Sequence, residues 1–148
     1  MNPGIEKSLK TTKFTKNGES KSKWILIDAN GQTLGRMSTK IASIIRGKTS
    51  AKFTPNTDTG DFVIVINAEK VRLTGKRENL KKYLHHSMYP GGQKVRSFKE
   101  LIGTHPEKVI RYSVRGMLPK NRLGNKLINK LKVYAGDKHP HSAQLPKA

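Results

Sequence analysis

The chain has no cysteine, few acidic residues and no long apolar run. The absence of cysteine excludes disulfides and thiolate chemistry and is compatible with a reducing compartment. The longest uninterrupted apolar run, residues 62–66, is far shorter than the roughly 20 residues that a membrane-spanning helix needs. The N-terminus also lacks the apolar segment of a secretory signal, so we expect a cytoplasmic protein.

The shortage of acidic residues leaves a large positive charge. The 148 residues include 30 Lys and Arg against 10 Asp and Glu, a formal net charge of +20. Self-repulsion on this scale destabilises a compact protein, so a polyanionic partner is expected. Nucleic acid is the first candidate and an anionic membrane the second. Hydrophobic residues make up only 34% of the chain, which indicates that part of it orders on its partner.

The length fits one domain with a single core. Residues 1–23 are rich in Lys, Ser, Thr and Asn without an apolar period, and predict a flexible basic N-terminal tail. A transit peptide fits this tail poorly, because it lacks Arg and contains Glu6 and Glu19. A single α/β RNA-binding domain is predicted over residues 24–136, and residues 137–148 are predicted as a C-terminal tail.

The first half of the domain has a strand–helix–strand pattern. The apolar run 24–27 predicts a buried strand, and residues 34–45 place apolar side chains at helical spacing. Thr33 can cap this helix and Gly47 can end it. Residues 62–66 predict a second buried strand, parallel to the first through a right-handed crossover.

Shorter elements are predicted in the second half. They are a short strand over 71–74, a loop or irregular strand over 83–92 and a short helix over 97–102. A capping box at 104–107 predicts a helix that stops at Gly116, and a last helix is expected from about 121 to 131. Together the elements predict helices on both faces of a mostly parallel sheet.

A basic segment over residues 114–136 carries the strongest functional signal. Its cations lie on an aliphatic frame that bends at Gly116 and Pro119, with Met117 and Leu118 expected to anchor the bend in the core. It contains no catalytic group. Fixed positive charge on a rigid support suits a surface that lies against phosphates, and these cations are Arg115, Lys120, Arg122, Lys126, Lys130 and Lys132.

The same segment and several other motifs, in the same order, resemble the universal family of large-subunit ribosomal protein thirteen. The resemblance covers residues 24–136 and implies a three-layer α/β/α fold with a parallel four-stranded sheet. It also implies early binding to large-subunit ribosomal RNA beside neighbouring ribosomal proteins, without catalysis, cofactor or small-molecule substrate. The motifs are Asp28-Ala29, Thr33-Leu34-Gly35-Arg36, Arg46-Gly47-Lys48, Thr54-Pro55, Asn67-Ala68-Glu69-Lys70-Val71 and Val133-Tyr134-Ala135-Gly136.

A second basic stretch comprises Lys70, Arg72, Lys76, Arg77, Lys81 and Lys82. The loop beyond it adds His85, His86, Tyr89, Lys94 and Arg96, and aromatic rings among cations suit unpaired RNA. The alternative for the cations is a solvated basic face, and for Tyr89 an aromatic ring packed on the domain surface. Beyond the 114–136 segment, the candidate RNA-binding residues are Arg36, Arg46, Lys48, Lys52, Lys76, Arg77, Lys81, Lys82, Tyr89 and Lys94.

Other chemistry has weak support. The adjacent His85 and His86 would point to opposite faces of an extended chain, so no metal site is expected. The segment 31–36 matches neither glycine-rich nucleotide fingerprint, and the acids near it are better explained as turn formers than as an acid–base pair. A free RNA-binding regulatory protein and a nucleotide-using enzyme remain as less favoured alternatives.

Overall fold

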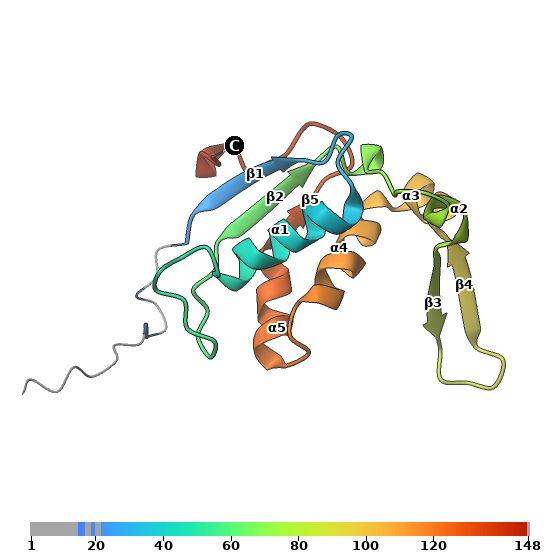
Figure 1. Cartoon of the computed structure of the whole chain (residues 1–148), viewed down its shortest axis with the longest axis horizontal. Coiled ribbons are helices and arrows are strands. Elements are labelled where there is room, and N and C mark those ends of the chain that lie inside the picture. The colour runs from blue at the N-terminus through green and yellow to red at the C-terminus, as the bar shows by residue number, and fades with distance from the viewer. Residues whose placement is uncertain (1–14, 17–18, 20–21, 148) are drawn as a thin grey trace, which may run out of the picture.

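The computed structural model describes residues 15–16, 19 and 22–147. Most of the predicted N-terminal tail lies outside these residues. The described chain forms a parallel sheet with packed helices and a separate antiparallel hairpin (Figure 1).

The parallel sheet has three strands in the order β1 (Trp24–Asp28), β2 (Phe62–Ile66) and β5 (Leu131–Val133). Trp24 pairs with Phe62, and Val63 pairs with Leu131. The predicted parallel strand–helix–strand unit is confirmed, but the expected four-stranded sheet is wrong. Beyond β1 the described chain adds only a single bridge, in which the N–H of Leu26 donates to the carbonyl of Lys147 at 2.7 Å.

Helix α1 (Leu34–Arg46) crosses from β1 to β2 and buries the apolar side chains that its spacing predicts. Gly47 ends it as expected, at a φ of 82°, where a side chain is unfavourable. Thr33 occupies the N-cap position, but its hydroxyl makes no capping hydrogen bond to the described helix.

The segment after β2 departs from expectation. It contains the single turn η1 (Ala68–Lys70), and the strand expected over 71–74 is reduced to one bridge between Thr33 and Arg72. After the short helix α2 (Arg77–Leu80), the segment 83–92, expected to be a loop or an irregular strand, belongs to an antiparallel hairpin. Its strands are β3 (Lys82–His86) and β4 (Gln93–Ser97).

Two helices follow the hairpin. In α3 (Phe98–Thr104) the Ser97 hydroxyl caps the N-terminus by accepting from the N–H of Glu100 at 3.2 Å. The predicted capping box at Thr104 is wrong, because its hydroxyl donates backwards to the carbonyl of Glu100. Helix α4 (Pro106–Met117) begins instead at Pro106, whose fixed φ suits a first helical position.

The predicted last helix is divided into α5 (Arg122–Leu127) and the turn η2 (Ile128–Lys130). This division allows β5 to begin at Leu131 and pair with β2. A last turn, η3 (Ser142–Gln144), lies in the predicted C-terminal tail.

One face of the sheet builds the core. Val63 and Val65 are fully buried against a cluster that includes Ile41 of α1 and Ile110 of α4. The opposite face carries aromatic rings, with Trp24 stacked on Phe62 at a centroid separation of 4.4 Å and the ring of His141 5.3 Å from Trp24. On this face, where a second layer of helices was expected, lies the C-terminal segment. Its one helical turn among the described residues is η3.

The hairpin projects from the body beyond α2 and α3, far from the start of β1 (Figure 1). Across the described part of the chain, no helix is both long and apolar enough to span a lipid bilayer.

Candidate nucleic-acid interface

The positive charge is almost wholly unneutralised within the structure. Among residues 15–16, 19 and 22–147, one ion pair occurs, between the Lys130 ammonium and the Asp58 carboxylate at 2.6 Å. The other described cations lack a described carboxylate partner within 4.0 Å and are free to meet an external polyanion.

Three shallow grooves adjoin one another around the end of α4. The first, between α1 and the 72–81 segment, shares Met117 with the second, which lies between α1 and the α4–α5 corner. The third, between α4 and α5, shares Leu118 and Pro119 with the second. Among the residues that the structure describes, no Asp or Glu lines any of the three. We call their cations the basic band: Arg46, Lys48, Arg72, Arg77, Lys81, Arg115 and Lys120.

The α4–α5 corner fixes part of this band. Leu118 is buried as predicted, but Met117 is 45% exposed and lines the grooves instead of anchoring the corner. The Asn121 side chain caps α5 by accepting from the N–H of Gly124 at 2.8 Å. A Cβ at Gly124 would lie only 1.8 Å from the carbonyl oxygen of Pro119. Close packing at this glycine therefore gives the flanking cations a fixed backbone.

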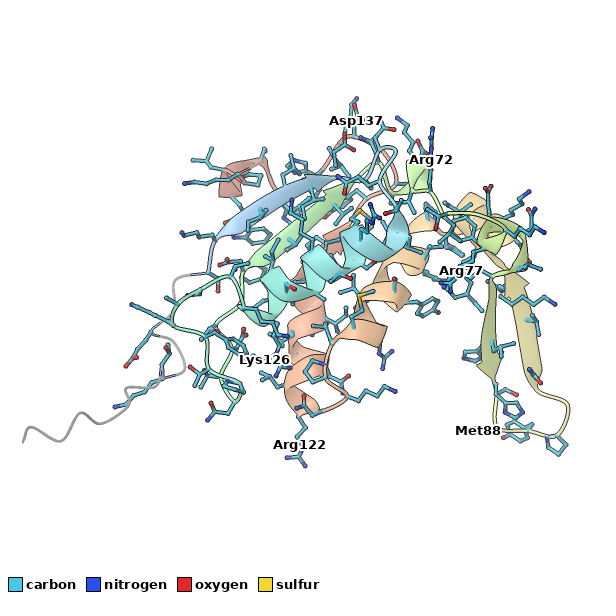
Figure 2. The ribbon with its side chains drawn as sticks, in the orientation of Figure 1. Arg72, Arg77, Met88, Arg122, Lys126 and Asp137 are labelled. Carbon is cyan, nitrogen blue, oxygen red and sulfur yellow. The ribbon has the colours of Figure 1, made fainter. Side chains whose placement is uncertain are left out.

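Helix α5 presents two cations beyond the corner. Arg122 and Lys126 are exposed, and Arg122 extends from α5 away from the sheet (Figure 2). Lys132 on β5 is only half-buried, and its backbone belongs to the sheet. These residues extend the positive surface without lining the basic band.

Lys130 does not belong to this exposed set. Its side chain is 10% exposed, and its ammonium donates to Asp58 and, at 2.7 Å, to the carbonyl of Gly60. The ammonium also lies 5.3 Å from the ring centroid of Phe62. Because this cation is neutralised inside the protein, we remove it from the candidate RNA-binding residues.

Several candidates lie outside the grooves. Arg36 on α1, Lys52 in the following loop and Lys76 before α2 are exposed. Arg46 is half-buried, with its guanidinium 6.0 Å from the centroid of the Phe53 ring. Of these four side chains, only Arg46 is brought into the basic band.

The hairpin forms a second positive surface. Lys82 and Lys94 are exposed on its strands, and no acidic residue occurs between residues 81 and 97. Tyr89 is 76% exposed in the turn and is not packed on the domain surface. Its neighbour Met88 lies at the far end of the hairpin (Figure 2). An exposed aromatic ring among cations can stack on an unpaired base.

One groove residue, Tyr112, was missed from sequence, because it lies in an amphipathic helix without a local motif. Arg72 belongs to the second basic stretch but was not among the candidate RNA-binding residues, and the structure places it in the first groove. Tyr112 nevertheless lines the groove between α4 and α5 and is 45% exposed. Its position beside Arg111, on a helix whose apolar side faces the core, is the one sequence signal that could have identified it.

The loop before α1 cannot act as a phosphate loop through its first amides. The N–H of Gly31 donates to the carbonyl of Lys70 at 3.2 Å, and the N–H of Leu34 donates to the carbonyl of Arg72 at 2.9 Å. These bonds occupy amides that a nucleotide phosphate would need.

The nearby acids also have structural roles. Asp28 accepts from the N–H of Asn30 and from the Asn67 side-chain amide, each at 2.9 Å, and these hydrogen bonds lower the pKa of its carboxyl. Asp61 accepts from the N–H of Lys23. In the part of the chain that the structure describes, no three His or acidic side chains form a cluster that could hold a metal ion.

Known proteins match nearly the whole chain. The family described as Ribosomal protein L13 matches residues 22–140. Large ribosomal subunit protein uL13 of Roseiflexus castenholzii is 57% identical over 132 residues, covering 89% of this chain and 90% of the relative. The protein of the same name from Natranaerobius thermophilus is 55% identical over 139 residues, covering 94% and 97%. The chain therefore belongs to the Ribosomal protein L13 family.

Proposed function

We propose that this protein is a structural, non-catalytic constituent of the large ribosomal subunit and binds large-subunit ribosomal RNA. The observation that carries this proposal is the basic band, in which cations from four parts of the chain line adjoining grooves without a carboxylate from the described residues. Its family relatives carry the name of a large-subunit protein.

Binding would rest mainly on phosphate contacts. Arginine can hold a phosphate through two N–H groups, whereas lysine acts more as a point charge. The corner at Gly124 holds Arg115 and Lys120 on either side of a rigid turn, so little conformational freedom is lost when phosphates bind. The hairpin adds Lys82, Tyr89 and Lys94 as contacts to less regular RNA.

We further propose that the protein joins the cytoplasmic subunit early and touches neighbouring ribosomal proteins. The chain has a charge of +20 and one ion pair among its described residues, so the first RNA that neutralises it relieves most of its electrostatic self-repulsion. No cofactor or small-molecule substrate is needed for this role. The nucleotide-using enzyme is disfavoured, since the candidate loop amides and acids already have structural partners.

Reversing two charges of the positive surface tests this function. We expect Arg115→Glu combined with Arg122→Glu to reduce the share of the protein that sediments with large subunits. The slope of log affinity against log salt concentration should also decrease by about two, one for each lost phosphate contact. Both side chains are exposed, so cooperative thermal unfolding should be retained.

The matched control is Lys99→Glu combined with Lys138→Glu, which changes the net charge equally at exposed sites outside the basic band. We expect this control to enter subunits more fully than the first variant. Equal incorporation of both variants at wild-type level would contradict the assignment of RNA binding to the basic band and the adjoining surface of α5. A large pool of wild-type protein bound to RNA away from ribosomes would favour the regulatory alternative.

A further inference from the structure

A separate pocket lies where the hairpin meets α4. The hairpin contributes Tyr83, His85, Lys94 and Arg96, while α4 contributes Lys108 and Tyr112. No carboxylate of the described chain lines this pocket, so its polar side chains are cations, an imidazole and phenols. This composition favours an anionic ligand that also has an apolar or aromatic part.

Two aromatic rings form part of the wall. The ring centroids of Tyr83 and Tyr112 lie 6.0 Å apart with an interplanar angle of 36°. The Lys81 ammonium lies 5.3 Å from the centroid of Tyr83, on the side of the first groove of the basic band. Tyr112 is 45% exposed, which leaves part of its ring available to a planar ligand.

The Tyr83 hydroxyl is buried and has no hydrogen-bond partner among the described residues. Such a group is unfavourable in a folded protein unless a further acceptor reaches it. Burial raises the pKa of Tyr83 to about 12, so the phenol stays protonated and can only gain by donating. Because this hydroxyl is closed to solvent, a ligand in the pocket can contact the Tyr83 ring but not its hydroxyl oxygen.

We propose that this pocket binds a single unpaired nucleotide of the RNA, with the base against Tyr112 and the phosphate among Lys94, Arg96 and Lys108. A duplex is excluded, because its bases are already stacked on both faces and cannot lie against a protein ring. An acidic peptide would satisfy the cations but would leave the ring of Tyr112 without a planar partner. This inference rests on the proposed function and specifies one RNA feature that the protein recognises.

The pocket is continuous with the basic band. Tyr112 also lines the groove between α4 and α5, beside Arg115 and Lys120. A strand that leaves its base in the pocket can therefore continue with its phosphates along that groove. This continuity favours a nucleotide within a chain over a free nucleotide.

The test uses the full chain with a labelled single-stranded RNA of about ten nucleotides, within the site sizes known for such strands. Its affinity is compared with that for a duplex of the same length, by fluorescence anisotropy at low salt. We expect Tyr112→Leu to weaken single-strand binding about 5- to 150-fold, the range of one base–aromatic stack. Duplex binding should change by about twofold or less.

Two further variants separate stacking from structure. Tyr112→Phe keeps the ring and should keep single-strand affinity, whereas Arg96→Gln should weaken it more than the exposed control Lys99→Gln does. Arg96 is exposed on β4, so this variant remains informative if Tyr112→Leu fails to fold.

The outcomes are distinct for the two proposals. Wild-type protein that binds neither RNA would overturn the proposed function. Wild-type protein that binds both, with Tyr112→Leu and Arg96→Gln unchanged or equally impaired on duplex, would overturn only the pocket. Displacement of the labelled strand by adenosine monophosphate at matching affinity would make the pocket a mononucleotide site and would contradict its role in RNA recognition.

Discussion

Lys130 and Asp58 form an ion pair in which both side chains are largely removed from water, at 10% and 14% exposed. The pair joins the turn η2, just before β5, to the loop that leads into β2. Gly60 takes part through its carbonyl, and a Cβ there would lie 1.7 Å from the carbonyl oxygen of Ile45. One cation of the basic segment is therefore used to hold the sheet together.

Replacing Lys130 tests this structural role. We expect Lys130→Met to lower the free energy of unfolding by about 3 kcal/mol, because it leaves Asp58 buried without a partner. Lys126→Met, one helical turn earlier and exposed, should change it by less than about 0.5 kcal/mol. Denaturant unfolding measures both variants. If Lys130→Met and Lys126→Met were equally stable and Lys130→Met bound RNA more weakly, Lys130 would be an RNA-binding residue and not a structural one.

The buried phenol of Tyr83 has a titration of its own. Its pKa of about 12 lies above the unfolded value of about 10, so its contribution to stability is complete below pH 10. That contribution is lost as the pH rises from about 10 to about 12. Tyr83→Phe should remove the tyrosinate absorbance that appears near pH 12. A difference signal centred near pH 10 would mean that this phenol is not buried.

At the scale of elements, the α4–α5 corner depends on one close approach. Gly124 has no room for a side chain beside Pro119. At Gly116, in the last turn of α4, an added Cβ would meet no described atom outside its own helix turn within 4 Å. The two glycines flank the same corner and differ in whether a Cβ fits. They form a natural matched pair.

Alanine at each glycine should have opposite effects. We expect Gly124→Ala to destabilise the fold by about 1–3 kcal/mol through overpacking. Gly116→Ala should stabilise it by about 0.5–1 kcal/mol, because glycine is costly inside a helix. Melting temperatures compare the two variants. A Gly124→Ala protein at least as stable as the wild type would show that the corner is loosely packed.

The elements that sequence predicted are those with a strong local signal. The strands at 24–28 and 62–66 contain continuous apolar runs, and helix α1 combines helical spacing with a glycine stop at Gly47. The hairpin escaped prediction because its strands are exposed on both faces and show no clean alternation. The three residues of β5 become a strand only by pairing with β2, which no local pattern reveals.

In the candidate site too, the residue types could be predicted from the sequence, whereas their grouping in space depends on the tertiary fold. The cations were visible in the sequence, but their grouping around Met117 depends on how α1 meets α4. Lys126 and Lys130 are four residues apart, a spacing that places both on one face of a helix. Only Lys130 forms an ion pair with a carboxylate of the described chain, that of Asp58 in a distant loop. The sequence therefore predicted the positive charge of the surface better than it predicted which cations belong to that surface.

At the scale of the whole molecule, the fold separates its charge from its core. The sheet and its helices bury an aliphatic cluster, while the grooves and the hairpin carry cations that form no ion pair with a described carboxylate. A net charge of +20 on 148 residues then favours whichever state places phosphates against those grooves.

The salt dependence of binding to large-subunit ribosomal RNA tests this claim most directly. If about six to ten phosphates are contacted, affinity should fall by roughly 10³ to 10⁵ between about 50 and 200 mM salt. Equilibrium binding at several salt concentrations gives the slope. An affinity that stays flat across this range, or no binding in dilute buffer, would contradict the account.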